Sequence, residues 1–180
     1  MPSGDGSCTF DEITNADSTL IGLSVIRHAL MMIIPTGCFI VNEAHWLTLD
    51  VVYLIAVKSG AIMGARVGGQ ITHFQHTEPS NPLSYVKPRL LAEYPQGAFL
   101  ADDFLQIDRK NFLLSSAEIR EVEMSNRKSH WTGPIPNSGV LNIKRRNAQT
   151  KKLILLGEQD FDGLRAKIQS CGIPISPHAV

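Results

Sequence analysis

The last third of the chain carries the pattern that constrains the fold most, a β-hairpin followed by an amphipathic helix. Two apolar runs, residues 140–143 and 153–156, flank a polar stretch that includes residues 146–150. Apolar runs separated by a short polar tip are typical of two antiparallel strands joined by a turn. We therefore predict a hairpin whose tip is rich in Lys and Arg.

A helix is predicted directly after the hairpin. Asp160 is a suitable N-cap, because its carboxylate can accept hydrogen bonds from the exposed backbone N–H groups of the first turn. Gly172 stands where a helix commonly ends, and Pro174 prevents continuation. One apolar face is expected, formed by Phe161, Leu164, Ile168 and Cys171.

Four segments upstream are predicted as strands. Residues 51–57 form a continuous apolar run rich in β-branched side chains, and a Ser-Gly turn signal follows. Residues 61–72 would return as the second strand of a hairpin, and residues 111–114 would form another strand. In residues 119–124, apolar and charged side chains alternate with a one-residue slip, which indicates a β-bulge.

Other segments are less regular. Residues 19–41 are ambiguous, because apolar residues recur at helical steps while the end of the segment could begin a strand. Residues 75–88 contain several prolines and are predicted as a loop without a regular element. Residues 126–138 are predicted as a second loop, in which His130 and Trp131 serve as an anchor.

The length of 180 residues indicates one domain. We expect a polar N-terminal lead over residues 1–18, a single β-rich domain over 19–172 and a C-terminal tail over 173–180. Within the domain, residues 90–94 are predicted as one helical turn, and residues 99–105 as a short helix or extended piece.

Five segments of the C-terminal half follow one order of strands, hairpin and helix: residues 112–114, 118–123, 139–144, 152–156 and 160–171. This order resembles the later strands and capping helix of bacterial pleckstrin-homology-like domains. The resemblance implies an α+β fold in which a bent antiparallel sheet, or partly open barrel, is closed by a C-terminal amphipathic helix. Function does not follow from this fold, since its members bind lipids, peptides or no known ligand.

Charge is distributed unevenly along a chain whose formal net charge is zero. Residues 93–123 hold seven acidic side chains against three basic ones, a sum of −4. Residues 127–152 hold seven Lys or Arg and no Asp or Glu, a sum of +7. The neutral total argues against general binding to nucleic acid, but it allows one local anion-binding face. It also allows the acidic face of one copy to meet the basic face of another in a homo-oligomer.

The basic hairpin is the predicted ligand site, and its residues are Lys144, Arg145, Arg146, Lys151 and Lys152. Converging cations of this kind can hold an anionic ligand, a lipid headgroup or an acidic protein. The alternative is a solvated hairpin tip, whose charges discourage edge-to-edge association of strands. We expect a non-enzymatic binding or interaction domain with no catalytic residue, no metal and no cofactor.

A second hypothesis is a small metal-dependent enzyme that uses loop histidines. His73, His76 and Glu78 have a spacing that suits metal ligands on a helix, and His45 with Glu43 could join them. The glycines and the proline around this segment disfavour a helix there, which favours ordinary surface histidines.

Two apolar stretches, residues 20–41 and 46–67, are candidates for membrane spans. Both contain charged residues and the first is interrupted by proline and glycine, so a buried core is favoured over a hairpin of two membrane helices. Cys8, Cys38 and Cys171 are scattered and predict no disulfide framework. No signal peptide is recognisable. We expect a cytoplasmic protein, able to lie peripherally at a membrane.

Overall fold

The computed structural model describes residues 37–43, 51–58, 60–71, 78–94 and 103–176. All of them belong to one compact unit, Thr36–Val180. The expected lead over residues 1–18 and most of the ambiguous segment 19–41 lie outside the described residues. The part of that segment that is described contains a strand, which begins at Phe39.

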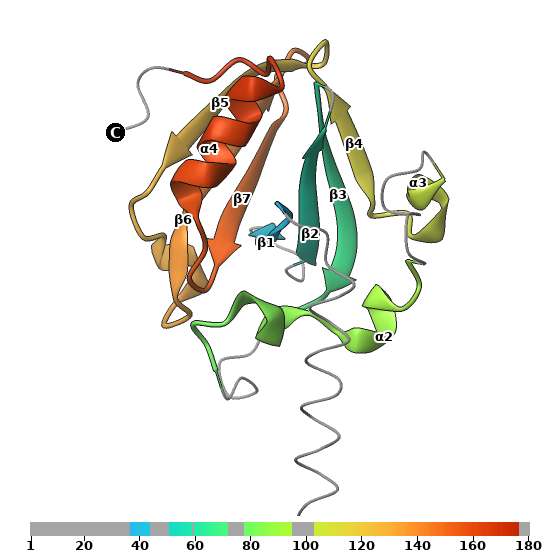
Figure 1. Cartoon of the computed structure of the whole chain (residues 1–180), viewed down its shortest axis with the longest axis vertical. Helices are drawn as coiled ribbons and strands as arrows, with labels where there is room; N and C mark the ends of the chain where they lie inside the picture. The colour runs from blue at the N-terminus through green and yellow to red at the C-terminus, as the bar shows by residue number, and fades with distance from the viewer. Residues whose placement is uncertain (1–36, 44–50, 59, 72–77, 95–102, 177–180) are drawn as a thin grey trace, which may run out of the picture. The chain divides into compact units, whose positions relative to one another are not determined.

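Seven strands form one antiparallel sheet that curls into a half-barrel (Figure 1). The strand order is β4-β3-β2-β1-β7-β6-β5. The strands are β1 (Phe39–Glu43), β2 (Val51–Lys58), β3 (Ala61–Gly68), β4 (Phe112–Ser115), β5 (Ile119–Ser125), β6 (Asn137–Arg145) and β7 (Thr150–Leu156). The expected antiparallel, partly open barrel is thus present, and it contains both predicted hairpins.

The connection between the two edge strands explains why the sheet curls. Strand β4 ends at Ser115 and β5 begins at Ile119, although the two strands occupy opposite ends of the strand order. In a flat sheet, six inter-strand spacings would separate them by about 29 Å. The backbone from Ser115 to Ile119 spans at most about 14 Å. A flat sheet is therefore excluded, and the edges must approach each other at this end.

The predicted hairpins and bulge are confirmed. Strand β2 pairs with β3, and β6 pairs with β7. The register of β5 against β6 shifts between Ile119 and Glu121, at the place where the one-residue slip occurs in the sequence. The bulge lets apolar side chains on both sides of the slip reach the same core. Ile119, Val122 and Met124 are accordingly all buried.

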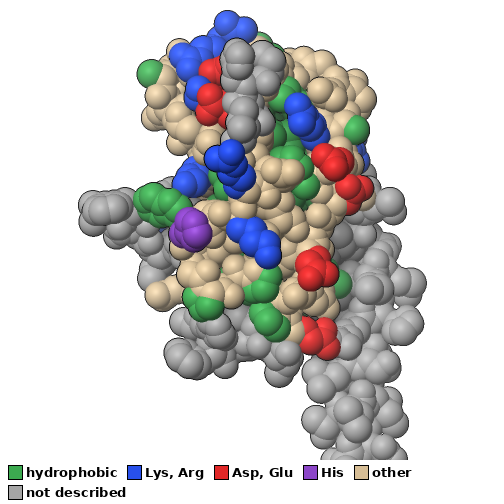
Figure 2. Space-filling view, turned by 90° about the vertical axis from the view of Figure 1, so that its left-hand side faces the viewer, with side chains coloured by type: hydrophobic (Ala, Val, Ile, Leu, Met, Phe, Trp, Pro, Cys, Tyr) green, Lys and Arg blue, Asp and Glu red, His purple; other side chains and the backbone are tan. Residues whose placement is uncertain are grey.

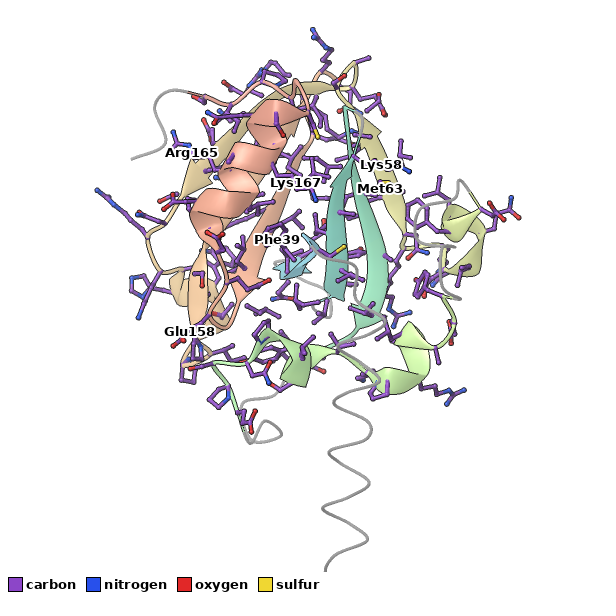
Figure 3. All side chains as sticks on the ribbon, viewed as in Figure 1. Phe39, Lys58, Met63, Glu158, Arg165 and Lys167 are labelled. Atoms are coloured by element: carbon purple, nitrogen blue, oxygen red, sulfur yellow. The ribbon has the colours of Figure 1, made fainter. Side chains whose placement is uncertain are left out.

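Helix α4 (Phe161–Ser170) packs its apolar side against the sheet (Figure 1). Leu164 and Ile168 are fully buried in the core that the sheet provides, and side chains from both layers occupy the space between them (Figure 3). The Gly163 N–H donates to the Asp160 carboxylate over 2.8 Å, which confirms the predicted N-cap. Gly172 adopts a φ of +71° directly after the helix, as a C-terminal glycine should.

The proline-rich segment is more regular than the sequence suggested. It contains a 3-10 helix η2 (Pro82–Tyr85), and a single helical turn α2 (Pro88–Leu91) follows. The prediction of a loop without regular elements was therefore wrong for this part of the segment. Both short helices begin with proline, which is tolerated there because the first-turn N–H groups have no intrahelical acceptor. Tyr85 and Leu91 are buried.

One turn of helix, α3 (Phe104–Ile107), precedes β4 and overlaps the end of the segment predicted as a short helix or extended piece. A 3-10 helix η4 (His130–Thr132) lies in the loop between β5 and β6, where no regular element was predicted. The segment after α4 is part of the domain rather than a tail as far as Ser176. Its backbone pairs with Val122 of β5 through hydrogen bonds of 2.8 and 2.9 Å, and Ile173 is buried.

None of the helices in the described ranges is long and apolar enough to cross a membrane. The second apolar stretch considered as a span folds as strands β2 and β3 instead. A pair of membrane helices over residues 20–67 is therefore wrong for its second half.

Candidate functional site

The five cations predicted to converge on the hairpin do not form one surface. Side chains alternate between the two faces of a strand, so neighbouring lysines on β7 point in opposite directions. Lys151 points to the face that carries the core, and Lys152 points to the outer face, next to Asn142 of β6. Figure 2 accordingly shows Lys and Arg side chains spread over one side of the molecule among hydrophobic, acidic and histidine side chains.

Lys144 is neutralised by acidic residues of the neighbouring strand. Its ammonium pairs with Glu121 over 2.9 Å and also with Glu123. The hydrogen bonds that Lys144 donates to the Glu123 and Glu121 carboxylates raise the pKa of Lys144, and the bond to Glu121 lowers the pKa of that carboxyl. Part of the acidic segment thus pairs with the basic segment within the same chain. A homo-oligomer in which the acidic face of one copy meets the basic face of another would need these same charges of Lys144, Glu121 and Glu123.

The two arginines at the tip are also engaged. Arg145 forms an ion pair with Glu118 over 3.2 Å and donates to Gln149 over 3.0 Å. Hydrogen bonds from the Ser115 backbone and hydroxyl, and then from Arg145, lower the pKa of Glu118. The Arg146 guanidinium donates to the Ala117 carbonyl oxygen over 2.8 Å. The tip is therefore tied to the turn between β4 and β5.

Lys151 belongs to a polar group at one end of the inner face of the sheet. Its ammonium pairs with Glu43 of β1 over 2.5 Å and lies 4.4 Å from the ring centre of Phe112 and 5.4 Å from that of Tyr53. Burial, and then the nearby Glu43 carboxylate, raise the pKa of the Tyr53 hydroxyl. The cation thus links β7 with β1, β2 and β4. This is a structural role rather than an exposed ligand contact.

Lys152 has a different environment, on the outer face of the sheet, where it is half-buried. Its ammonium lies 4.4 Å from the centre of the Trp131 ring. Trp131 is 56% exposed, more than any other large hydrophobic residue among those the structure describes. Arg127 and Lys128, in the same loop, are exposed and form no ion pair within the described ranges. We call Arg127, Lys128, Trp131 and Lys152 the Trp131 face.

The Trp131 face combines an exposed aromatic ring, the Lys152 ammonium beside it, and two exposed cations from the same loop. The prediction that Trp131 anchors its loop was wrong, since an anchor would be buried. The loop is held instead by buried polar side chains, and its tryptophan is left at the surface. A tryptophan between basic residues, in a short segment with few other apolar residues, is the sequence signal that could have suggested this.

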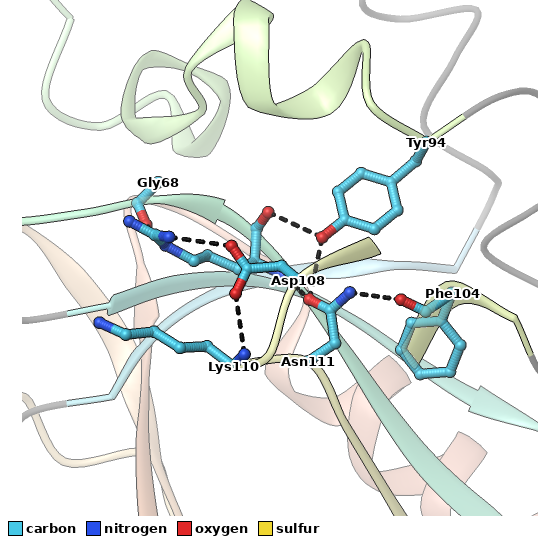
Figure 4. A network of polar contacts seen from close by, with 7 residues as sticks. Gly68, Tyr94, Phe104, Asp108, Lys110 and Asn111 are labelled. Atoms are coloured by element: carbon cyan, nitrogen blue, oxygen red, sulfur yellow. Dashed lines mark hydrogen bonds and ion pairs between the residues drawn. The ribbon is translucent and has the colours of Figure 1, made fainter. Parts of the chain in front are cut away.

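A second polar network joins the segment before β4 to strand β3 (Figure 4). Arg66 forms an ion pair with Asp108 over 2.9 Å, and its backbone N–H donates to Asn111 over 2.8 Å. Asn111 in turn donates to the Phe104 carbonyl oxygen over 2.5 Å and accepts from the Tyr94 hydroxyl over 2.9 Å. Each member has a partner inside the chain, so the network holds this segment on the sheet.

The predicted histidine ligands and the cysteines form no functional site within the described residues. His45, His73 and His76 lie outside them, and the described ranges contain no group of metal-binding side chains. Cys38 and Cys171 are free thiols. Burial raises the pKa of Cys38 to about 11, although Lys167 opposes this effect, so Cys38 is a poor nucleophile at neutral pH.

Comparison of the chain with protein-family models, with curated proteins and with solved structures finds no match. Any statement about function therefore depends on the geometry of the sites themselves.

Proposed function

We propose that this protein is a non-enzymatic, pleckstrin-homology-like binding domain that attaches to anionic membrane surfaces through the Trp131 face. One observation carries the proposal: a tryptophan that is 56% exposed, with the ammonium of Lys152 only 4.4 Å from the centre of its ring. The strand order, followed by one helix packed on the sheet, supports the resemblance to the pleckstrin-homology-like superfold.

The residue types suit the boundary between water and lipid. Tryptophan is enriched at that boundary, where its apolar ring and its polar N–H meet different surroundings. Lys and Arg are attracted by the negative surface potential of a cytoplasmic leaflet, by about 1 kcal/mol each. The three cations of the Trp131 face then contribute about 3 kcal/mol, or about 150-fold in the partition coefficient.

A membrane is favoured over an acidic protein partner because of the lysines. Lysine is depleted in protein–protein interfaces, whereas clusters of Lys and Arg beside an interfacial aromatic residue are typical of membrane-attached surfaces. Lys128 and Lys152 supply two of the three cations of the Trp131 face. An acidic polypeptide remains the outcome that the test below must separate.

The test is co-sedimentation with vesicles of neutral phosphatidylcholine, with and without phosphatidylserine. We expect binding only to the anionic vesicles and a decrease with salt. Lys152→Glu changes the charge by two units and is expected to weaken binding about 30-fold. Lys58→Glu is the control, because it makes the same change of charge at an exposed residue outside the Trp131 face, at the end of β2 (Figure 3). It should weaken binding much less.

Trp131→Ala separates the contribution of the aromatic ring from that of the charges. We expect weaker vesicle binding with an unchanged salt dependence, because the number of interacting charges stays the same. Equal binding to neutral and anionic vesicles would contradict the proposal. A second result would also contradict the proposal: the protein binds soluble polyglutamate but no vesicles, and Trp131→Ala still binds polyglutamate normally. That result would indicate an acidic protein partner.

A further inference from the structure

The loop that carries Trp131 is held by one buried amide side chain. Asn137, the first residue of β6, is 6% exposed. Its Oδ1 accepts from the Ser129 backbone N–H over 2.8 Å, and its Nδ2 donates to the Ser129 carbonyl oxygen over 3.0 Å. Both backbone groups of a residue two positions before Trp131 are thereby satisfied by a single side chain.

The same amide reaches the other end of the turn. Asn137 Nδ2 lies 3.1 Å from the Thr132 hydroxyl oxygen, and the Thr132 hydroxyl donates to the Ile135 carbonyl oxygen over 3.0 Å. Between these points, the Trp131 N–H donates to the Ser129 hydroxyl oxygen over 3.3 Å. The residues on both sides of Trp131 are therefore fixed to the start of β6.

These contacts do more than satisfy buried hydrogen-bond donors and acceptors. A buried amide that pairs with both backbone groups of one residue determines where that residue lies, because donor and acceptor must match at once. Trp131 extends from the backbone of η4, and the side chain of Asn137 holds that backbone on both sides of Trp131.

We infer that Asn137 is a positioning residue for the Trp131 face, which it holds in the binding conformation before any contact is made. The inference rests on the proposed function, because it assigns Asn137 a role in that binding. Holding a loop in its bound conformation lowers the entropy lost on association. Replacing Asn137 should therefore weaken binding about threefold to tenfold, without altering any residue that touches the surface.

The first measurement uses the free protein. In the full chain with Trp46→Phe, Trp131 is the only tryptophan, and its fluorescence anisotropy reports the mobility of the loop. Asn137→Ala should lower the anisotropy. Asn142→Ala is the matched control, since Asn142 lies on the same strand and makes no side-chain hydrogen bond within the described ranges. It should leave the anisotropy unchanged.

The second measurement is the affinity for phosphatidylserine-containing vesicles. We expect Asn137→Ala to bind threefold to tenfold more weakly with the same salt dependence as the parent chain, and Asn142→Ala to bind normally. Thr132→Val removes only one contact of the amide and should shift both measurements in the same direction by less. It keeps the test informative if Asn137→Ala fails to fold.

The two proposals fail in different ways. If the parent chain does not bind anionic vesicles, the proposed function is wrong, whatever the anisotropy. If the parent binds but Asn137→Ala and Thr132→Val leave both anisotropy and affinity unchanged, the inference about Asn137 is wrong. A change in affinity that comes with a changed salt slope would also overturn it, because the charged contacts themselves would then differ.

Discussion

Lys151 and Lys152 are adjacent, carry the same charge and should respond in opposite ways to the same substitution. We predict that Lys151→Met destabilises the fold and that Lys152→Met leaves stability almost unchanged while weakening vesicle binding. Methionine keeps the length and apolar character of the side chain. The comparison therefore isolates the ammonium group and the face of the sheet on which it lies.

The magnitude follows from the surroundings of each ammonium. Lys151 is paired with Glu43 over 2.5 Å, and the side chains are 20% and 9% exposed. Removing one partner of a fully buried ion pair costs about 3–5 kcal/mol. Because Lys151 is partly exposed, we expect about 2–3 kcal/mol, which includes its contacts with Tyr53 and Phe112. Lys152 loses one exposed contact with Trp131, which is worth about 0.5–1 kcal/mol.

Urea denaturation of the full chain measures both changes, with the slope m checked for constancy. Glu43→Gln combined with Lys151→Met removes both charges and should restore part of the lost stability, which gives the coupling energy of the pair. Losses of equal size for the two lysine variants would refute the assignment of Lys151 to the inner face. So would a double variant as unstable as the sum of the single ones.

Four further outcomes follow from the structure. Gln159→Ala should cost about 2–3 kcal/mol in urea denaturation, because its amide bonds the N–H and carbonyl of Ile40, at 2.8 and 2.7 Å, beyond the end of the β1–β7 pairing. Ala148→Gly should stabilise the fold by about 0.5–1 kcal/mol, since Ala148 has a φ of +65°. Gly157→Ala should lower the melting temperature, because the added Cβ would lie 2.5 Å from a backbone oxygen and the φ is +67°. Burial opposes ionisation of Asp108, but hydrogen bonds from the Lys110 backbone and from the Arg66 guanidinium lower its pKa. Its stabilisation should be present above the ordinary aspartate pKa and be lost as pH falls through the lowered one, so Asp108→Asn and the parent chain should converge in stability in acid.

Local patterns predicted the regular elements of the C-terminal half. Asp160 and Gly172 bounded the last helix correctly, because capping depends on groups within one turn of each residue. The bulge near Glu121 was also visible, since a slip in a period-two pattern is a local property. The 3-10 helix at Pro82 was missed and the helical turn predicted over residues 90–94 begins earlier, at Pro88, because proline was taken as a breaker, although it is favourable in a first helical turn.

The candidate site was only partly predictable. The sequence identified Lys152 as a binding residue and Arg127 and Lys128 as members of the basic segment, but it grouped them with cations that are paired inside the chain. Pairing of Lys144 with Glu121 and Glu123 depends on the register of β5 against β6, which a count of charges cannot supply. His130 and Trp131 were predicted only as an anchor of their loop, and the exposure of Trp131 depends on how that loop lies against the start of β6.

The hairpins, the bulge and the capped helix follow from local patterns, because hydrophobic period, turn residues and caps act over a few residues. Which charges are available to a partner depends instead on contacts between residues that are distant in sequence. Lys151 meets Glu43 across 108 positions of sequence, and that contact exists because β1 pairs with β7 in the curled sheet. Of the seven cations between residues 127 and 152, Lys144, Arg145 and Lys151 have an acidic partner in the fold, and Lys152 lies over the exposed ring of Trp131 instead.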